Sequence, residues 1–127
     1  MGVAASGLIL EGLSSCASFP VVKVNSNENM VQVPLNLLTN SAMNIVRPSQ
    51  IDYDVFISKN ENNGYLCLVL KCTHQDWNLV SNPKGFNCSL HGSMFDLTGK
   101  VLNGPAVHPL KRLKSEVFND QLVIHLV

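Results

Sequence analysis

The sequence predicts an all-β fold built as one domain. Within its 127 residues, short apolar runs alternate with turn-forming stretches in which Gly, Pro and Asn are frequent. Hydrophobic residues make up 46% of the chain against 14% for charged residues, which is enough to bury a core at this length. No internal repeat or linker divides the chain, and no stretch of 18 apolar residues is present that could cross a bilayer as a helix.

Residues 1–18 form an apolar segment that we separate from the domain at 19–127. Glu11 is its only charge, and the stretch "LSSC" near its end reaches Cys16. An apolar run followed by small residues and a Cys resembles the end of a bacterial lipoprotein signal, although the basic start of a secretory signal is missing. We therefore expect a remnant of such a signal, with Cys16 as a lipid anchor and residues 17–34 as a tether. The alternative is a short helix packed on the domain.

Short β runs begin at residue 19. "FPVVKV" and "MVQVPL" flank an Asn-rich turn, and Pro34 marks the second run as an edge strand or a strand end. The next two candidate strands are "NIV" and "DVFIS". "YLCLVLK" (65–71) follows the turn signal "KNENNG" and should form a hairpin with "DVFIS". Because this run is apolar at nearly every position, it should lie in the middle of a sheet.

The remainder of the chain predicts two loops and two further hairpins. The run at 65–71 leads directly into a first loop, and "FNCSL" starts a second one. "MFDLTGKVLNG" predicts a strand, a tight turn at Thr98-Gly99 and another strand. The final run, 113–127, should turn at Asn119-Asp120, and its last part alternates between apolar and polar residues.

The charge pattern argues against several classes of function. Nine basic and nine acidic residues cancel, and no block of like charge stands out, so neither nucleic acid nor a polybasic membrane contact is expected. No Ser–His–Asp set, Gly-rich phosphate loop or carboxylate pair is evident. Hydrolytic and nucleotide chemistry are therefore not expected.

Two mixed pairs of metal-ligating residues carry the chemistry. They are Cys72-x-His74 and Cys88-x-x-His91, with 13 residues between His74 and Cys88. Thiolate and imidazole together suit zinc, copper and iron–sulfur clusters, so the residue types alone do not choose between metals. The order favours a cluster, because a structural zinc finger keeps Cys with Cys and His with His. A mixed pair on each of two loops can place both thiolates on one iron and both imidazoles on another.

The motifs "CTH", "CSLHGSMFD" and "GKVLNGPAVHPL" together resemble the Rieske iron–sulfur family, over about residues 54–127. The resemblance implies an antiparallel β sandwich or barrel with a small subdomain, whose loops at 72–77 and 88–96 bind a [2Fe–2S] cluster. By this analogy Cys72 and Cys88 bind the inner iron, and His74 and His91 bind the outer iron. Ser93 would donate a hydrogen bond to a cluster sulfur, which favours the reduced state. Gly104-Pro105-Ala106 corresponds to the proline loop that covers the cluster.

Departures from the family pattern concern the loops. Rieske proteins of cytochrome bc complexes have two further Cys that bridge the loops, and this chain has Trp77 and Leu90 at those positions. The loops should then be held by packing, with Trp77, Phe86 and Pro105 as candidates. The missing bridge resembles the Rieske ferredoxins of ring-hydroxylating oxygenases, whereas "HGSMFD" resembles the respiratory type. Cys67, within an apolar run, is expected to be a buried small hydrophobic residue.

These features predict an electron-transfer protein or oxidoreductase subunit without substrate turnover of its own. We expect a lipid-anchored carrier on the periplasmic side of a bacterial membrane, in a respiratory or quinol-linked chain. Its partner would be a cytochrome, an oxidase or a reductase, and quinol could supply the electrons. The first alternative is a soluble cytoplasmic ferredoxin that serves an oxygenase. The second is a structural zinc module.

Overall fold

The computed structural model describes residues 19–126 except 20, 28, 61 and 63. The expectations for residues 1–18, including Cys16, lie outside this range. The described residues form strands and one short 3-10 helix, which confirms the all-β prediction. None of their helices is long and apolar enough to cross a membrane. In chain order the elements are β1 (Val21–Val24), β2 (Met30–Pro34), η2 (Leu35–Leu38), β3 (Met43–Pro48), β4 (Val55–Lys59), β5 (Tyr65–Val69), β6 (Val80–Asn82), β7 (Gly85–Asn87), β8 (Met94–Asp96), β9 (Val101–Asn103), β10 (Arg112–Leu113), β11 (Ser115–Phe118) and β12 (Gln121–His125).

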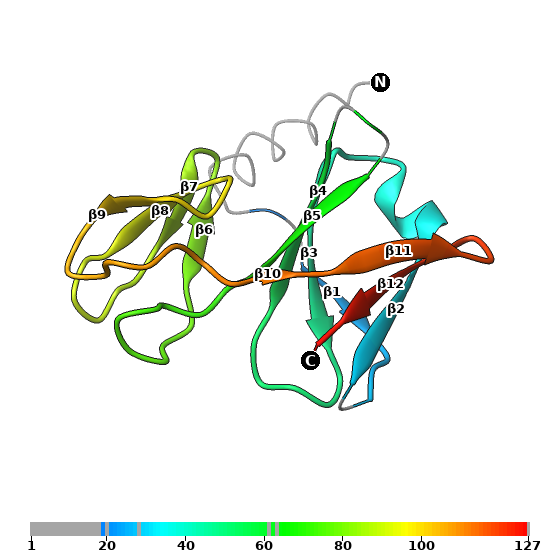
Figure 1. The fold of residues 1–127 in the computed structure, drawn as a ribbon, viewed down its shortest axis with the longest axis horizontal. Coiled ribbons are helices and arrows are strands. Elements are labelled where there is room, and N and C mark those ends of the chain that lie inside the picture. Colours follow the sequence, from blue (N-terminus) through cyan, green and yellow to red (C-terminus); the bar gives the residue numbers. More distant parts are fainter. Residues whose placement is uncertain (1–18, 20, 28, 61, 63, 127) are drawn as a thin grey trace, which may run out of the picture.

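Two sheets form the base of the molecule, on the right in Figure 1. One has five strands in the order β1-β3-β4-β5-β10, and the other has three in the order β11-β12-β2. The predicted hairpin between β4 and β5 is present, and β5 lies inside the sheet as expected. β2 is an edge strand that ends at Pro34, as its proline predicts. The pairing of β1 with β3 is parallel and is an exception to the antiparallel sheets that the sequence predicts.

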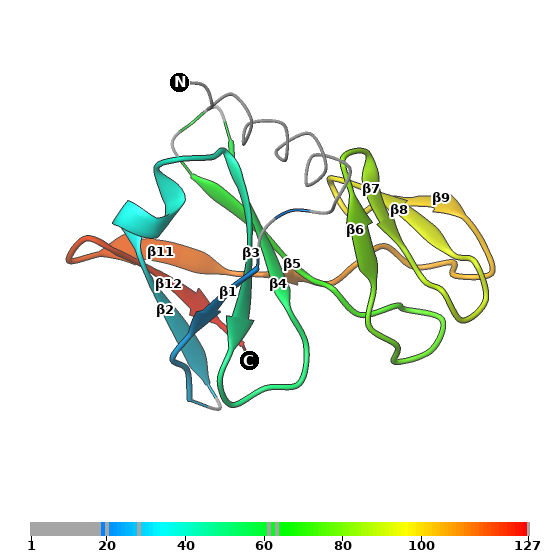
Figure 2. The same ribbon diagram turned by 180° about the vertical axis from the view of Figure 1, so that it is seen from behind.

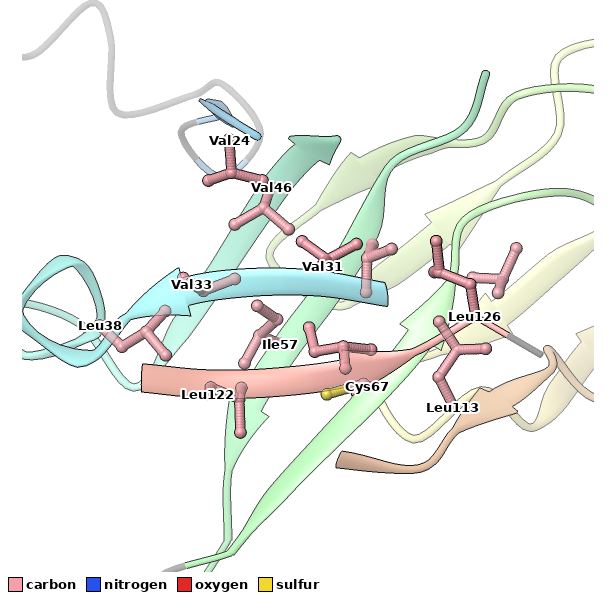
Figure 3. Close-up of a cluster of buried hydrophobic side chains, with 13 residues drawn as sticks. Val24, Val31, Val33, Leu38, Val46, Ile57, Cys67, Leu113, Leu122 and Leu126 are labelled. Carbon is pink, nitrogen blue, oxygen red and sulfur yellow. The ribbon is translucent and has the colours of Figure 1, made fainter. Parts of the chain in front are cut away.

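The two base sheets pack face to face through an aliphatic core. Figure 3 shows Val31 and Val33 of β2 and Leu122 of β12 facing Ile57 and Cys67 of the five-stranded sheet. All five of these side chains are at most 1% exposed. Burial of such apolar area supplies the main driving force for folding of the base.

β4 and β5 are buried on both faces, which explains their nearly continuous apolar sequences. Val55 and Ile57 point into the core between the base sheets, whereas Phe56 belongs to a second core on the opposite face. On β5, Cys67 and Leu68 divide between the two cores in the same way. The second core therefore lies on the face of the five-stranded sheet that is turned away from the three-stranded sheet.

A smaller four-stranded antiparallel sheet, β6-β7-β8-β9, covers this second core. It is seen at the right of Figure 2, beside the five-stranded sheet. Phe86 of β7 and Phe95 of β8 are paired across the sheet and both are 1% exposed. The Phe86 ring packs edge-on against Phe56, with ring centroids 5.0 Å apart, so this contact joins the small sheet to the base.

Candidate metal centre

The first ligand loop leaves the five-stranded sheet just beyond β5. A backbone bridge between Lys71 and Asn78 closes it at its base. Inside the loop, the N–H of Cys72 donates a 2.9 Å hydrogen bond to the carbonyl of Trp77. The loop is thus a closed turn on a rigid strand, and Cys72 is held at its buried end.

The second ligand loop is the connection of the β7–β8 hairpin, in which Asn87 pairs with Met94. The N–H of Cys88 donates to the carbonyl of Ser93 at 2.8 Å, and the N–H of Gly92 donates back to the carbonyl of Cys88 at 3.0 Å. Gly92 has φ +86°, a left-handed conformation that glycine adopts without a steric cost. His91, which lies within this turn, is exposed.

The two loops bring the candidate thiols together below the surface. Cys72 and Cys88 are each 2% exposed and belong to the second core. Burial by itself raises the pKa of the Cys72 thiol. Hydrogen bonds from the backbone of Gln75 and His74 and from the side chains of Cys88 and Ser93 outweigh burial, so that this pKa is lowered from its ordinary value. Because metals bind the thiolate, the surroundings of Cys72 favour the ligating form.

The two candidate imidazoles, unlike the thiols, lie at the surface. His74 and His91 are both exposed, and their ring centroids are 5.2 Å apart with an angle of 76° between the ring planes. Each loop therefore contributes one buried thiol and one exposed imidazole. Among the described residues, no three His, Cys, Asp or Glu side chains gather around one point as ligands of a single ion. The candidate ligands are two pairs, and this donor set fits a binuclear cluster with two ligands on each iron.

A third segment lies against both ligand loops and is called the third loop; it consists of Asn103 at the end of β9 and the loop 104–110 that follows. The N–H of Ala106 donates a 3.0 Å hydrogen bond to Oγ of Ser93, which is fully buried. The structure therefore brings Ser93 and the predicted proline loop together beside Cys72. The peptide bond between Gly104 and Pro105 is cis.

Two hydrogen-bonding residues of the site are not predicted from the sequence. Oγ1 of Thr73 donates to the carbonyl of His108 at 2.6 Å, and Nδ2 of Asn103 donates to the carbonyl of Gly92 at 3.3 Å. Both bonds run between the third loop and a ligand loop. Their only sequence signal is that Thr73 lies between two ligands and Asn103 begins the "NGPA" stretch.

Trp77 does not pack beneath the loops, contrary to the sequence expectation. Its side chain is 48% exposed, and it lines a surface hollow of about 600 Å³ together with Asp52, Lys71 and Asp76. The backbone carbonyl of Trp77, not its indole, closes the first loop. Phe86, by contrast, is buried against Phe56 as expected.

The remaining cysteine of the described range lies away from the site. Cys67 faces the core between the base sheets, and burial raises its pKa to about 11. Cys67, Cys72 and Cys88 are all free thiols. Cys67 is a buried hydrophobic residue, as predicted.

Comparison with protein families gives one matching model. The family described as "Rieske [2Fe-2S] domain" matches residues 36–114, which is more than half of the chain.

Two curated relatives that match part of the chain are named as iron-sulfur subunits of the cytochrome b6-f complex. The chain is 30% identical over 77 residues to the cytochrome b6-f complex iron-sulfur subunit of Chlorobaculum thiosulfatiphilum, covering 59% of this chain and 42% of that protein. It is 40% identical over 57 residues to subunit 1 of the same name from Nostoc sp. (strain PCC 7120), covering 42% of this chain and 31% of that protein. The chain thus spans less than half the length of these relatives.

Solved structures share the fold. The cyanobacterial plasma membrane Rieske protein of Synechocystis PCC 6803 has a TM-score of 0.55 at 24% identity, over 72% of this chain and 94% of that one. A chain in the complex of oxygenase and ferredoxin of carbazole 1,9a-dioxygenase has a TM-score of 0.51 at 15% identity, over 78% of this chain and 94% of that one.

Proposed function

Because the chain belongs to the Rieske [2Fe–2S] family, we propose that it carries single electrons between protein partners through a cluster held by Cys72, Cys88, His74 and His91. The observation that supports this most directly is the separation of the four side chains. The two thiols are 2% exposed, while the two imidazoles lie together at the surface. One end of the site is thus shielded from water and the other is open to a partner.

The family cofactor, when bound, accepts and releases one electron, and the chain supplies the surroundings that tune this step. Two thiolates and two neutral imidazoles leave the oxidised site with less negative charge than four thiolates would. An electron is therefore added more readily, at potentials of roughly −150 to +300 mV against about −400 mV for four-Cys sites. The Ser93 hydroxyl, beside Cys72, adds a hydrogen bond toward sulfur and should raise the potential further.

The exposed imidazoles would form the contact with the partner. Leu90, next to His91, is 38% exposed, and Val107 of the third loop is 78% exposed. Apolar side chains around the imidazole edge can exclude water from a docked partner without fixing its identity. A partner that docks on the exposed imidazoles would bring its own redox group near the cluster.

For the cellular setting, we propose a membrane-tethered carrier in a respiratory or quinol-linked chain, on the periplasmic side. Support comes from the apolar residues 1–18 that end close to Cys16, from the "HGSMFD" motif and from the relatives named as cytochrome b6-f subunits. Its donor would be quinol or a membrane protein, and its acceptor a cytochrome or an oxidase. Lipid on Cys16 would hold the domain at the membrane, and mass spectrometry of the protein from a native membrane tests this directly.

One feature favours a second candidate, a soluble ferredoxin for an oxygenase. Trp77 and Leu90 stand where bridging cysteines would be needed, so the loops have no covalent bridge. The choice of electron donor separates the two proposals. Reduction by quinol with a membrane quinol oxidoreductase supports the first, and reduction only by a flavin reductase supports the second.

The experiment that tests the core of the proposal is an electron paramagnetic resonance titration of the purified protein against applied potential. We expect a signal typical of a His-ligated [2Fe–2S] cluster on reduction. A colourless protein that contains zinc and gives no signal would instead mean that the four residues hold a structural metal, and the electron-transfer proposal would be wrong.

A further inference from the structure

The third loop makes a hydrogen bond to each ligand loop at a residue adjoining a candidate imidazole ligand. Thr73 directly precedes His74, and its Oγ1 donates to the carbonyl of His108 at 2.6 Å. Gly92 directly follows His91, and its carbonyl accepts from Nδ2 of Asn103 at 3.3 Å. The two ligand loops are thus both attached to one segment, residues 103–108.

These bonds act at the side of the site where packing is weakest. The thiol end is buried in the second core, and there Ala106 is bonded to Ser93. His74 and His91 are exposed, so surrounding side chains do little to fix the distance between them. Positions 77 and 90 are Trp and Leu, and no described cysteine forms a disulfide, so no disulfide joins the two ligand loops in the part of the chain that the structure describes.

From this arrangement we propose that Thr73 and Asn103 are positioning residues that set the separation of His74 and His91 by attaching both ligand loops to the third loop. The inference rests on the proposed function, since it assigns these two side chains a role toward the same cluster. Residues 103–108 would take the place of a covalent bridge, joining the loops through a third segment and not directly to one another. The Thr73 hydroxyl and the Asn103 amide are the two groups that the role requires.

The first test is a set of variants of the full chain: Thr73→Val, which keeps the shape of the side chain and removes the hydroxyl, Asn103→Ala, and the double variant. Thr73→Ser restores the hydroxyl, and Asn36→Ala, an exposed residue of η2 on the base, is the matched control. One net hydrogen bond contributes about 1 kcal/mol, so each single change should speed loss of the cluster to an iron chelator by about fivefold. Thr73→Ser and Asn36→Ala should stay within about twofold of the wild type.

The double variant tests whether the two residues act on one element. While one of the two bonds remains, one of the two imidazole ligands keeps its attachment to this segment, so the double variant should lose the cluster faster than the product of the two single effects. The line positions of the reduced cluster in electron paramagnetic resonance should also change, because they respond to the orientation of the imidazole ligands. Loss rates and spectra that match the wild type in both single variants would overturn the proposal, as would Thr73→Ser behaving like Thr73→Val.

Amide hydrogen exchange on the protein as purified separates this inference from the proposed function. Asn103→Ala should speed exchange at the amides of Cys88 and Gly92, and Thr73→Val should speed it at Cys72, because these amides close the two ligand loops. This readout holds whatever metal is bound. A wild type without the His-ligated signal would refute the electron-transfer proposal, whereas unchanged exchange in the variants would refute the positioning role alone.

Discussion

The backbone N–H of Ala106 donates a 3.0 Å hydrogen bond to Oγ of Ser93, and both residues are buried, at 3% and 0% exposure. The same hydroxyl lies beside Cys72 and contributes to the lowering of its pKa. A single side chain therefore joins the third loop to the thiol end of the site.

Replacing Ser93 with Ala should change stability and potential together. The Ala106 N–H would be left buried without a partner, which costs on the order of 1–3 kcal/mol of unfolding free energy. The midpoint potential should fall, because a hydrogen bond toward sulfur that favours the reduced state is removed. Thermal unfolding and a redox titration measure the two effects. Ser89→Ala, an exposed serine of the same loop, is the control, and an unchanged midpoint in Ser93→Ala would remove the electronic role.

The cysteines of the described range allow a matched comparison of ligand and core positions. Cys88→Ala should give protein with little iron or acid-labile sulfide, because one of the two inner ligands is lost. Cys67→Ala should keep both, at a cost on the order of 1 kcal/mol for the vacated volume in the core. Elemental analysis and the visible spectrum measure the outcome. Full cluster content in Cys88→Ala would contradict the ligand assignment.

Much of the fold could be predicted because turn chemistry is local. Asn119 and Asp120 have φ of 51° and 61°, values that a two-residue hairpin turn of type I′ requires and that these residue types tolerate. The strand at 65–69 could be placed inside a sheet because both of its faces are apolar. The parallel partner of β1 could not be predicted, since its four residues show what is buried but not which strand lies beside them.

The ligand pairs are also a local signal, whereas the contacts that hold the loops are not. Spacing alone points to Cys72, His74, Cys88 and His91. Thr73 and Asn103 act through partners 35 and 11 residues away, and nothing in the sequence specifies those distances. The expectation that Trp77 packs beneath the loops fails for a related reason. A large apolar residue is usually buried, yet here the backbone carbonyl of Trp77 closes the first loop and the indole is exposed.

Gly85 should be intolerant of any side chain. A Cβ at this position would lie 2.1 Å from the carbonyl oxygen of Phe95 on the paired strand, so the backbone of the β7–β8 hairpin would have to move. Gly85→Ala should lower stability by about 1–3 kcal/mol and reduce cluster content, because this hairpin carries the second ligand loop. Thermal unfolding and iron content measure the effect. Gly104→Ala is the comparison, since its Cβ would meet nothing closer than 3.9 Å, and equal losses in the two variants would contradict the steric argument.

Asp96 should make the small sheet sensitive to acid. Its Oδ1 accepts hydrogen bonds from the N–H of Thr98 at 2.8 Å, from Oγ1 of Thr98 at 2.7 Å and from the N–H of Lys100 at 3.0 Å. Burial alone would raise the pKa of this carboxyl, but these hydrogen bonds and the charge of Lys100 outweigh burial and lower it below the ordinary 3.8. A pKa that is lower in the folded than in the unfolded state means that the folded protein binds the proton less well.

The stability from the ionised Asp96 is therefore present at pH values above about 3.8 and is lost as the pH falls through the lower folded value. Asp96→Ala should reduce the free energy of unfolding at pH 7 by on the order of 1–3 kcal/mol. Asp96→Asn, which keeps an acceptor oxygen without the charge, should lose less. Denaturant unfolding of the three proteins from pH 7 to pH 3 measures this, and the difference between wild type and Asp96→Asn should shrink toward pH 3. A difference that stays constant over this range would show that the charge of Asp96 contributes nothing and that only the geometry of the turn matters.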